Sequence, residues 1–202
     1  VGANIVVNGR SDQAAVDAVA AELARDYGVE TLPFLADVTD RAAVDAMAAA
    51  TEARFGRVDV VVSDAAHRNQ TPFLEMDYAE WRNVLGVALD GAFNVCQAFG
   101  RLMAAGGNGG SIVTISGISN RVGTLNRIHV NAAKAGLEGF TRGLAREMAP
   151  HAINVNSVAP GMIDTTRGAS AGARPGLDER GVPLGRKGTV DEIAGLVRFL
   201  AS

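Results

Sequence analysis

The 202-residue chain holds a single cysteine, Cys96, so no disulfide can form within it, and a reducing, cytoplasmic interior suits the protein. Only two tyrosines are present, Tyr27 and Tyr78, which restricts where a phenol could take part in chemistry. No apolar run approaches the roughly 18–20 residues that a membrane helix needs, so no membrane partner is expected. The net charge of −3 leaves no basic footprint for nucleic acid, and a small-molecule substrate is expected instead.

What the sequence does contain is a regular alternation of apolar runs and amphipathic stretches. The predicted strands cover residues 3–8, 31–37, 58–64, 109–116 and 153–160. The predicted helices cover residues 11–28, 40–56, 78–105, 128–149 and 189–202, with Ser11, Asp40 and Thr189 as caps. Strands rich in Val and Ile between long helices indicate an α/β fold, a doubly wound parallel sheet with helices on both faces.

The whole chain, residues 1–202, is predicted to be one domain, with a long irregular segment over residues 160–188. A loop of that length in a compact domain is usually functional, so this segment is expected to form a substrate lid.

Ligands of such sheets bind at the carboxyl ends of the strands. In chain order, the predicted strand ends read "VVNGRS", "ADVTD", "VVSDAA", "TISGIS" and "VNSVAPGMIDT", and "NAAK" lies on the helix before the last. This series resembles the short-chain dehydrogenase/reductase family, a single-domain Rossmann fold that uses NAD or NADP. The resemblance implies a homodimer or homotetramer in which the helices over 79–104 and 128–149 pair, although these helices can equally pack only on their own sheet.

By the same resemblance, a first strand with a glycine-rich phosphate loop belongs before residue 1, and a last strand after residue 202. The first strand would lie in the middle of the sheet, and without it two strand edges would be unpaired. We therefore expect sequence to be missing at both ends.

The resemblance places the adenosine ribose at the end of the first predicted strand. Asn8 stands where an acidic residue would favour NAD, and Arg10 can pair with a 2′-phosphate, so NADP is expected over NAD, with Ser11 as a further contact. Alternatively, Arg10 is a solvated loop residue. Asp37 and Val38 match the adenine-binding strand end, although Asp37 would also suit a turn.

Two other segments match the cofactor site of the family. The family has a segment that flanks the nicotinamide, and this segment is matched here by Pro160, Gly161, Ile163 and Thr165. The Asn-Asn-Ala-Gly of the family is replaced by Ser63, Asp64, Ala65 and Ala66. Ala66 adds a methyl group where glycine allows close approach, and Asp64 adds a negative charge near the nicotinamide ribose.

The catalytic set of the family is largely absent. Its lysine is present as Lys134, which is also expected to hold the nicotinamide ribose, but its tyrosine, serine and asparagine fall on Val130, Gly117 and Ala88. Two neighbours are candidate substitutes: Ser119, expected in a loop, and His129, whose pKa range suits acid–base chemistry. His129 can also be a cap or a surface residue. The adjacent Ser116 should face the opposite side of its strand.

Two classes of function remain open. One is an NADP(H)-dependent oxidoreductase acting on a carbonyl or 3-oxoacyl group, or on an enoyl or dienoyl thioester. "NRIHVNAAKAG" resembles the 2,4-dienoyl-CoA reductase branch, in which the helical tyrosine is displaced. The other is a nucleotide-binding protein without redox activity, a scaffold or a lyase-like site.

Overall fold

The computed structural model describes residues 2–165 and 182–202, so most of the predicted lid lies outside the described part. Its strands are β1 (Ile5–Gly9), β2 (Thr31–Leu35), β3 (Val60–Ser63), β4 (Gly110–Ile115) and β5 (Ile153–Val158). Its helices are α1 (Gln13–Tyr27), α2 (Arg41–Phe55), α3 (Tyr78–Leu85), α4 (Gly91–Gly106), α5 (Ser119–Val122), α6 (Ile128–Met148) and α7 (Val190–Leu200), with a π-helical turn η1 (Gly86–Asp90) and a 3-10 turn η2 (Ala149–His151).

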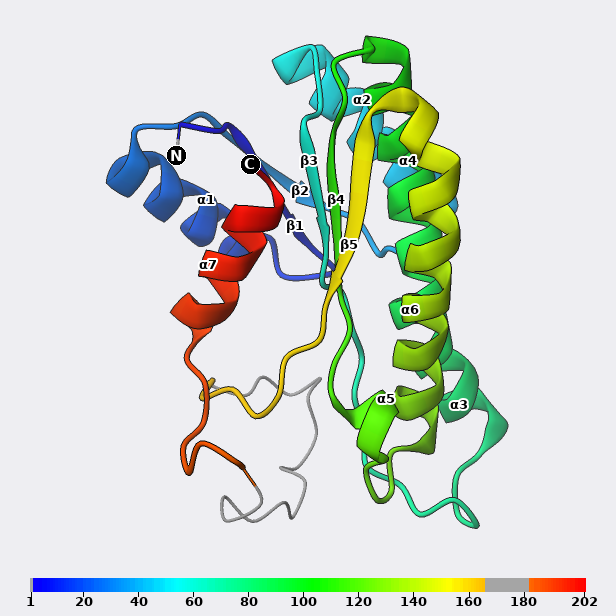
Figure 1. The fold of residues 1–202 in the computed structure, drawn as a ribbon. Coiled ribbons are helices and arrows are strands. Elements are labelled where there is room, and N and C mark those ends of the chain that lie inside the picture. The colour runs from blue at the N-terminus through cyan, green and yellow to red at the C-terminus, as the bar shows by residue number, and fades with distance from the viewer. Residues whose placement is uncertain (1, 166–181) are drawn as a thin grey trace.

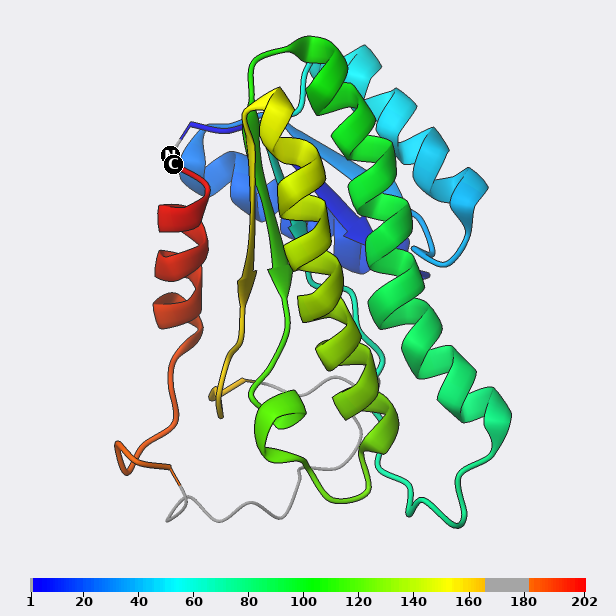
Figure 2. The ribbon, with the colours of Figure 1, turned by 45° about the vertical axis from the view of Figure 1, so that its right-hand side comes forward.

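Every strand pairing is parallel, which confirms the predicted α/β fold. The strands form two hydrogen-bonded groups, β1-β2 and β3-β4-β5. No described strand joins the two groups, and the resemblance places its further strand at this gap. Helices α4 and α6 cover one side of the sheet, whereas α1 and α7 lie on the other (Figures 1 and 2).

The helix ends agree with the sequence in two of three cases. Asp40 caps α2 as predicted, and Thr189 caps α7 in a reciprocal capping box with Glu192. The predicted cap Ser11 is wrong, because the carboxylate of Asp12 accepts the hydrogen bond from Ala15 N instead. The helix therefore begins one residue later than a Ser11 cap implies, at Gln13.

The core lies between the sheet and helices α2 and α4. Its most enclosed side chains include Ile112, which is fully buried on the central strand β4, and Cys96 on α4. Burial raises the pKa of the Cys96 thiol to about 12, so this residue packs as a small apolar group. Among the helices that the structure describes, none is long and apolar enough to cross a membrane.

The long helix predicted over residues 78–105 is interrupted. The turn η1 separates α3 from α4 and contains Ala88, which stands at the asparagine position of the resemblance. Directly after this turn, Gly91 packs so closely on Val38 that an added Cβ would lie 2.5 Å from its Cγ2. Single π-helical turns within α-helices are frequently found at functional sites.

Candidate functional site

The candidate site is built around Lys134, on the second turn of α6. Its residue surface is only 5% exposed, and its Nζ donates to the carbonyl oxygen of Ile115 at 2.5 Å. Because Ile115 is the last residue of β4, this bond fixes the amine at the carboxyl end of the central strand. In Figure 1 this is the end of the sheet at which α5 lies.

Asp64, which follows β3 directly, is the charged partner of this amine. Burial and, to a smaller extent, the positive Arg68 together lower the pKa of Lys134 to about 8, against the opposing effect of the negative Asp64. Desolvation raises the pKa of Asp64, although the positive charges of Lys134 and Arg68 oppose that change. The Asp64 residue is exposed to solvent, so the pair lies at the boundary between the interior and the solvent.

No polar side chain stands at the three positions where the resemblance expects a tyrosine, a serine and an asparagine. Val130, one helical turn before Lys134, is 4% exposed, and Ala88 is 3% exposed. The two tyrosines of the chain lie at helix ends, and both are largely exposed, Tyr27 at 71% and Tyr78 at 75%. Neither of them replaces Val130 as a buried partner of Lys134.

Ser119 does take up the region that the absent serine would fill. A Cβ built on Gly117 would lie 3.8 Å from the Oγ of Ser119. The expectation of a loop here is wrong, because Ser119 is the first residue of the one-turn helix α5. That turn folds the hydroxyl back over Gly117, while Ile118 N donates to the carbonyl of Pro160 and ties this segment to the end of β5.

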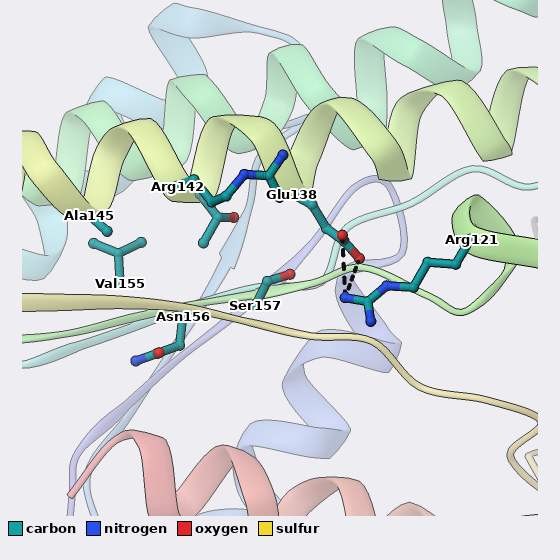
Figure 3. A pocket seen from close by; sticks show the side chains of 8 residues that line it. Arg121, Glu138, Arg142, Ala145, Val155, Asn156 and Ser157 are labelled. Atoms are coloured by element: carbon teal, nitrogen blue, oxygen red, sulfur yellow. Dashed lines mark hydrogen bonds and ion pairs between the residues drawn. The ribbon is translucent and has the colours of Figure 1, made fainter.

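The neighbouring Ser116 faces away from this region, as predicted. Its hydroxyl donates to Oε1 of Glu138 at 3.0 Å. Glu138 also accepts from Arg121, and the two side chains point toward one another at the edge of a pocket between α6 and β5 (Figure 3). Hydrogen bonds from Asn120, Ser116 and Arg121 lower the pKa of Glu138, so the carboxylate stays charged and anchors α5.

His129 lies outside the crevice, which corrects the expectation that it could supply acid–base chemistry. Its residue surface is 0% exposed, and its Nε2 lies 3.2 Å from Oε1 of Glu80. The same Glu80 oxygen accepts from the hydroxyl of Thr71 at 2.7 Å. A fully enclosed imidazole cannot reach a substrate, so His129 links α6 to α3 and to the loop that carries Thr71.

The predicted nucleotide residues line the carboxyl ends of β1 and β2. Asn8 uses its Oδ1 to accept from Ala36 N at 3.1 Å, which crosslinks the two strands and leaves the amide donors of this exposed residue unused by that bond. Arg10 and Ser11 are exposed. Hydrogen bonds from Thr39, with a smaller contribution from the positive Arg10, lower the pKa of Asp37.

The remaining predicted contacts divide into enclosed and open groups. Val38 is buried beneath α4, where its carbonyl accepts from Asn94 Nδ2 at 2.9 Å. The other predicted contacts are exposed or half-buried, namely Ala65, Ala66, Pro160, Gly161, Ile163 and Thr165. Ile163 forms a parallel bridge with Gly188, which closes the described ends of the predicted lid against each other.

These residues fit a nicotinamide nucleotide. The ammonium of Lys134 has three donors, and the bond to Ile115 uses one of them, so donors remain for the hydroxyl groups of a ribose. Arg10 offers charged donors and Asn8 offers amide donors. Both lie at the end of β1, where the resemblance places the adenosine ribose. Within residues 2–165 and 182–202, no cluster of three His, Cys, Asp or Glu side chains could hold a metal ion.

Sequence reasoning missed two carboxylates. Glu80 and Glu138 come from helix positions that carry no motif, and only the folded chain shows that they hold His129 and the α5 segment. Asp64 was expected to add a negative charge near the nicotinamide ribose, and in the folded chain that charge also acts on Lys134.

Comparison with known proteins places the chain among oxidoreductases. A family model described as enoyl-(acyl carrier protein) reductase matches residues 1–202. A 3-oxoacyl-[acyl-carrier-protein] reductase of Synechocystis sp. is 35% identical over 201 residues, which is 100% of this chain and 80% of the relative. The corresponding Escherichia coli protein is 37% identical over 185 residues, covering 90% of this chain and 75% of its own length.

The chain is also similar in fold and in sequence to solved structures. A short-chain type dehydrogenase/reductase from Mycobacterium marinum superimposes with a TM-score of 0.90 at 33% identity, covering 100% of this chain and 78% of that one. A gluconate 5-dehydrogenase from Burkholderia cenocepacia, solved with NADP and tartrate, gives a TM-score of 0.85 at 30% identity, covering 98% and 77%.

Proposed function

The chain belongs to the short-chain dehydrogenase/reductase family of NAD(P)-dependent oxidoreductases, and we propose that it reduces the carbonyl group of a 3-oxoacyl thioester with NADPH. The observation that carries this proposal is the amine of Lys134, held at the carboxyl end of β4 beside Asp64. A buried, charged side chain in a crevice is costly for folding, which favours a role in chemistry. The curated relatives supply the 3-oxoacyl substrate class.

NADP is the proposed cofactor, and when bound it supplies the hydride. Asn8 and Arg10 present donors where an acidic residue would repel the 2′-phosphate. Asp37 adds a negative charge nearby, but Thr39 and Arg10 both compensate it. The NADP complex of the gluconate 5-dehydrogenase supports the same cofactor class.

In this proposal one side chain of the protein acts on the substrate and another holds the cofactor. Ser119 donates a hydrogen bond to the substrate carbonyl from the region vacated at Gly117. Lys134 holds the ribose of the nicotinamide and thereby orients the cofactor beside that carbonyl. The neighbouring Val130 presents only apolar atoms, so it excludes water and takes no part in proton transfer.

Reduction of an enoyl or dienoyl thioester is the second candidate, and the apolar Val130 favours it. Hydride transfer to a conjugated carbon places the proton on another carbon, so a tyrosine beside Lys134 is not needed. The present site retains the lysine and lacks that tyrosine.

For the assembly, we propose a homodimer or homotetramer. On α6, Gly136 packs within the chain, since an added Cβ would lie 3.1 Å from Leu89. At Gly143 an added Cβ would meet nothing within 4 Å, which leaves room at this point of α6 for a second copy.

The direct test follows NADPH absorbance with a 3-oxoacyl thioester, an enoyl thioester and a dienoyl thioester in parallel. We expect NADPH to be oxidised with the 3-oxoacyl substrate, at a higher kcat/KM than NADH. Turnover of the enoyl or dienoyl substrates alone would establish the second candidate. Quenched protein fluorescence with NADPH but no turnover of any substrate would establish a nucleotide-binding protein without redox activity.

Ser119→Ala is expected to lower kcat by roughly 10²-fold, because one positioned donor to a developing oxyanion has about that effect. KM should change little, since the bond strengthens as charge develops on the oxygen. The matched control is Ser116→Ala, which removes a hydroxyl three residues away that bonds Glu138 instead. Steady-state kinetics of both variants check this, and equal losses would exclude the role given to Ser119.

A further inference from the structure

We propose that Lys134 is itself the proton donor of the reaction, and that Asp64 is the positioning residue that keeps its amine charged. This inference rests on the proposed carbonyl reduction. The tyrosine that delivers the proton elsewhere in the family is replaced here by Val130. The inference therefore assigns proton delivery to the ammonium of Lys134.

The geometry restricts the choice of donor. His129 is fully buried against Glu80, and Ser116 is bonded to Glu138, so neither faces the substrate region. Nζ of Lys134 is fixed on the carbonyl of Ile115, two residues before Gly117 and hence beside the region that Ser119 fills. In the proposed complex the ammonium donates to the same substrate oxygen as Ser119.

The proton inventory of the step balances. Bound NADPH would supply the hydride to the carbonyl carbon, and the π electrons of the carbonyl bond would move to its oxygen. One N–H bond of the Lys134 ammonium then breaks as the O–H bond of the product alcohol forms. The neutral amine regains its proton from water, and the cofactor leaves in its oxidised form.

Asp64 is needed because burial opposes the charged amine. Ser63 pairs with Thr114 in the parallel register of β3 and β4, so Asp64 comes beside Ile115, the residue whose carbonyl holds Nζ of Lys134. The charges of Asp64 and of Arg68, in the loop that follows, act on the amine. Asp64 favours the ammonium, whereas burial and Arg68 both favour the neutral amine. With the pKa at about 8, the lysine is charged at neutral pH and still a far stronger acid than a lysine in water.

Asp64→Asn tests the inference by two independent readouts. The chain contains two lysines, Lys134 and Lys187, so selective ¹³Cε labelling gives a simple NMR spectrum in which the pKa of each amine is measured without cofactor or substrate. We expect the variant to lower the pKa of Lys134 by about one unit, since one nearby opposite charge has that effect. The alkaline limb of kcat should move down equally, which reduces kcat about fivefold at pH 8 with little change at pH 6.

The matched control is Asp59→Asn, which removes a carboxylate at the amino end of the same strand, where Asp59 pairs with Arg57. It should leave the pKa of Lys134 and the pH profile unchanged. A Lys134 resonance unmoved by Asp64→Asn would overturn the role of Asp64. A resonance that moves while the kinetic limb stays in place would overturn proton donation by Lys134. Failure of the wild-type protein to reduce any 3-oxoacyl thioester would instead refute the proposed function, while the NMR titration would still report on the pair.

Discussion

Lys134→Met is expected to lower kcat/KM for carbonyl reduction by roughly 10³-fold or more, because it removes both the ribose contact and the proton donor. Methionine matches the length of the lysine stem, so the apolar packing around position 134 is retained. Stopped-flow measurement of NADPH oxidation separates the loss of chemistry from any loss of cofactor affinity.

Loss of folding is not expected in this variant. The folded pKa of Lys134 lies near 8, below its ordinary 10.5, so burying the charge costs stability at neutral pH, and this cost disappears as pH rises through that interval. Lys134→Met should therefore melt at the same temperature as the wild type or higher at pH 7. A variant that melts normally and retains more than about a tenth of the activity would contradict the central role of Lys134.

Gly110→Ala is expected to destabilise the fold by about 3 kcal/mol or more. The φ angle of Gly110 is +143°, a conformation that L side chains rarely adopt. An added Cβ would also lie 2.5 Å from Cε of Met103 and would overlap the backbone oxygen of Asp59. Because that oxygen belongs to the chain entering β3, the overlap can be relieved only by displacing β3 or β4. The melting temperature should fall by roughly 10 °C.

Gly107→Ala provides the comparison within the same turn. Its φ angle is +68°, and an added Cβ would meet nothing within 4 Å. Only the conformational cost remains, which is about 1 kcal/mol for a residue in the left-handed region. Equal losses in the two variants would show that the contact between the turn and β3 has no special cost. Urea denaturation at fixed pH measures both differences.

Much of the fold could be predicted from the sequence, because periodicity is a local property. The run over 110–115 has few polar side chains and none that is charged, as suits a strand covered on both faces, and Asp40 and Thr189 have the side chains that cap helices. Ser11 was a wrong prediction for an equally local reason: Asp12 is also a good cap, and nothing in the pattern decides between two adjacent cap residues.

The site was less predictable, because its contacts join residues far apart in the chain. Spacing predicted the helix that carries Lys134, but the position of the His129 side chain depends on Glu80, which lies 49 positions away. Likewise, the position of Ser119 depends on the one-turn helix α5, which is too short to leave a periodic pattern. The charge of Asp64 acquires its meaning only when β3 and α6 are brought together.

The π-helical turn over Gly86–Asp90 forms with Ala88 at the position that the resemblance assigns to an asparagine. Backbone shape and side-chain reactivity are thus separable at this position, because the wide turn forms without an amide side chain. A single Ala88→Asn substitution could therefore introduce an amide there with no rebuilding of the helix.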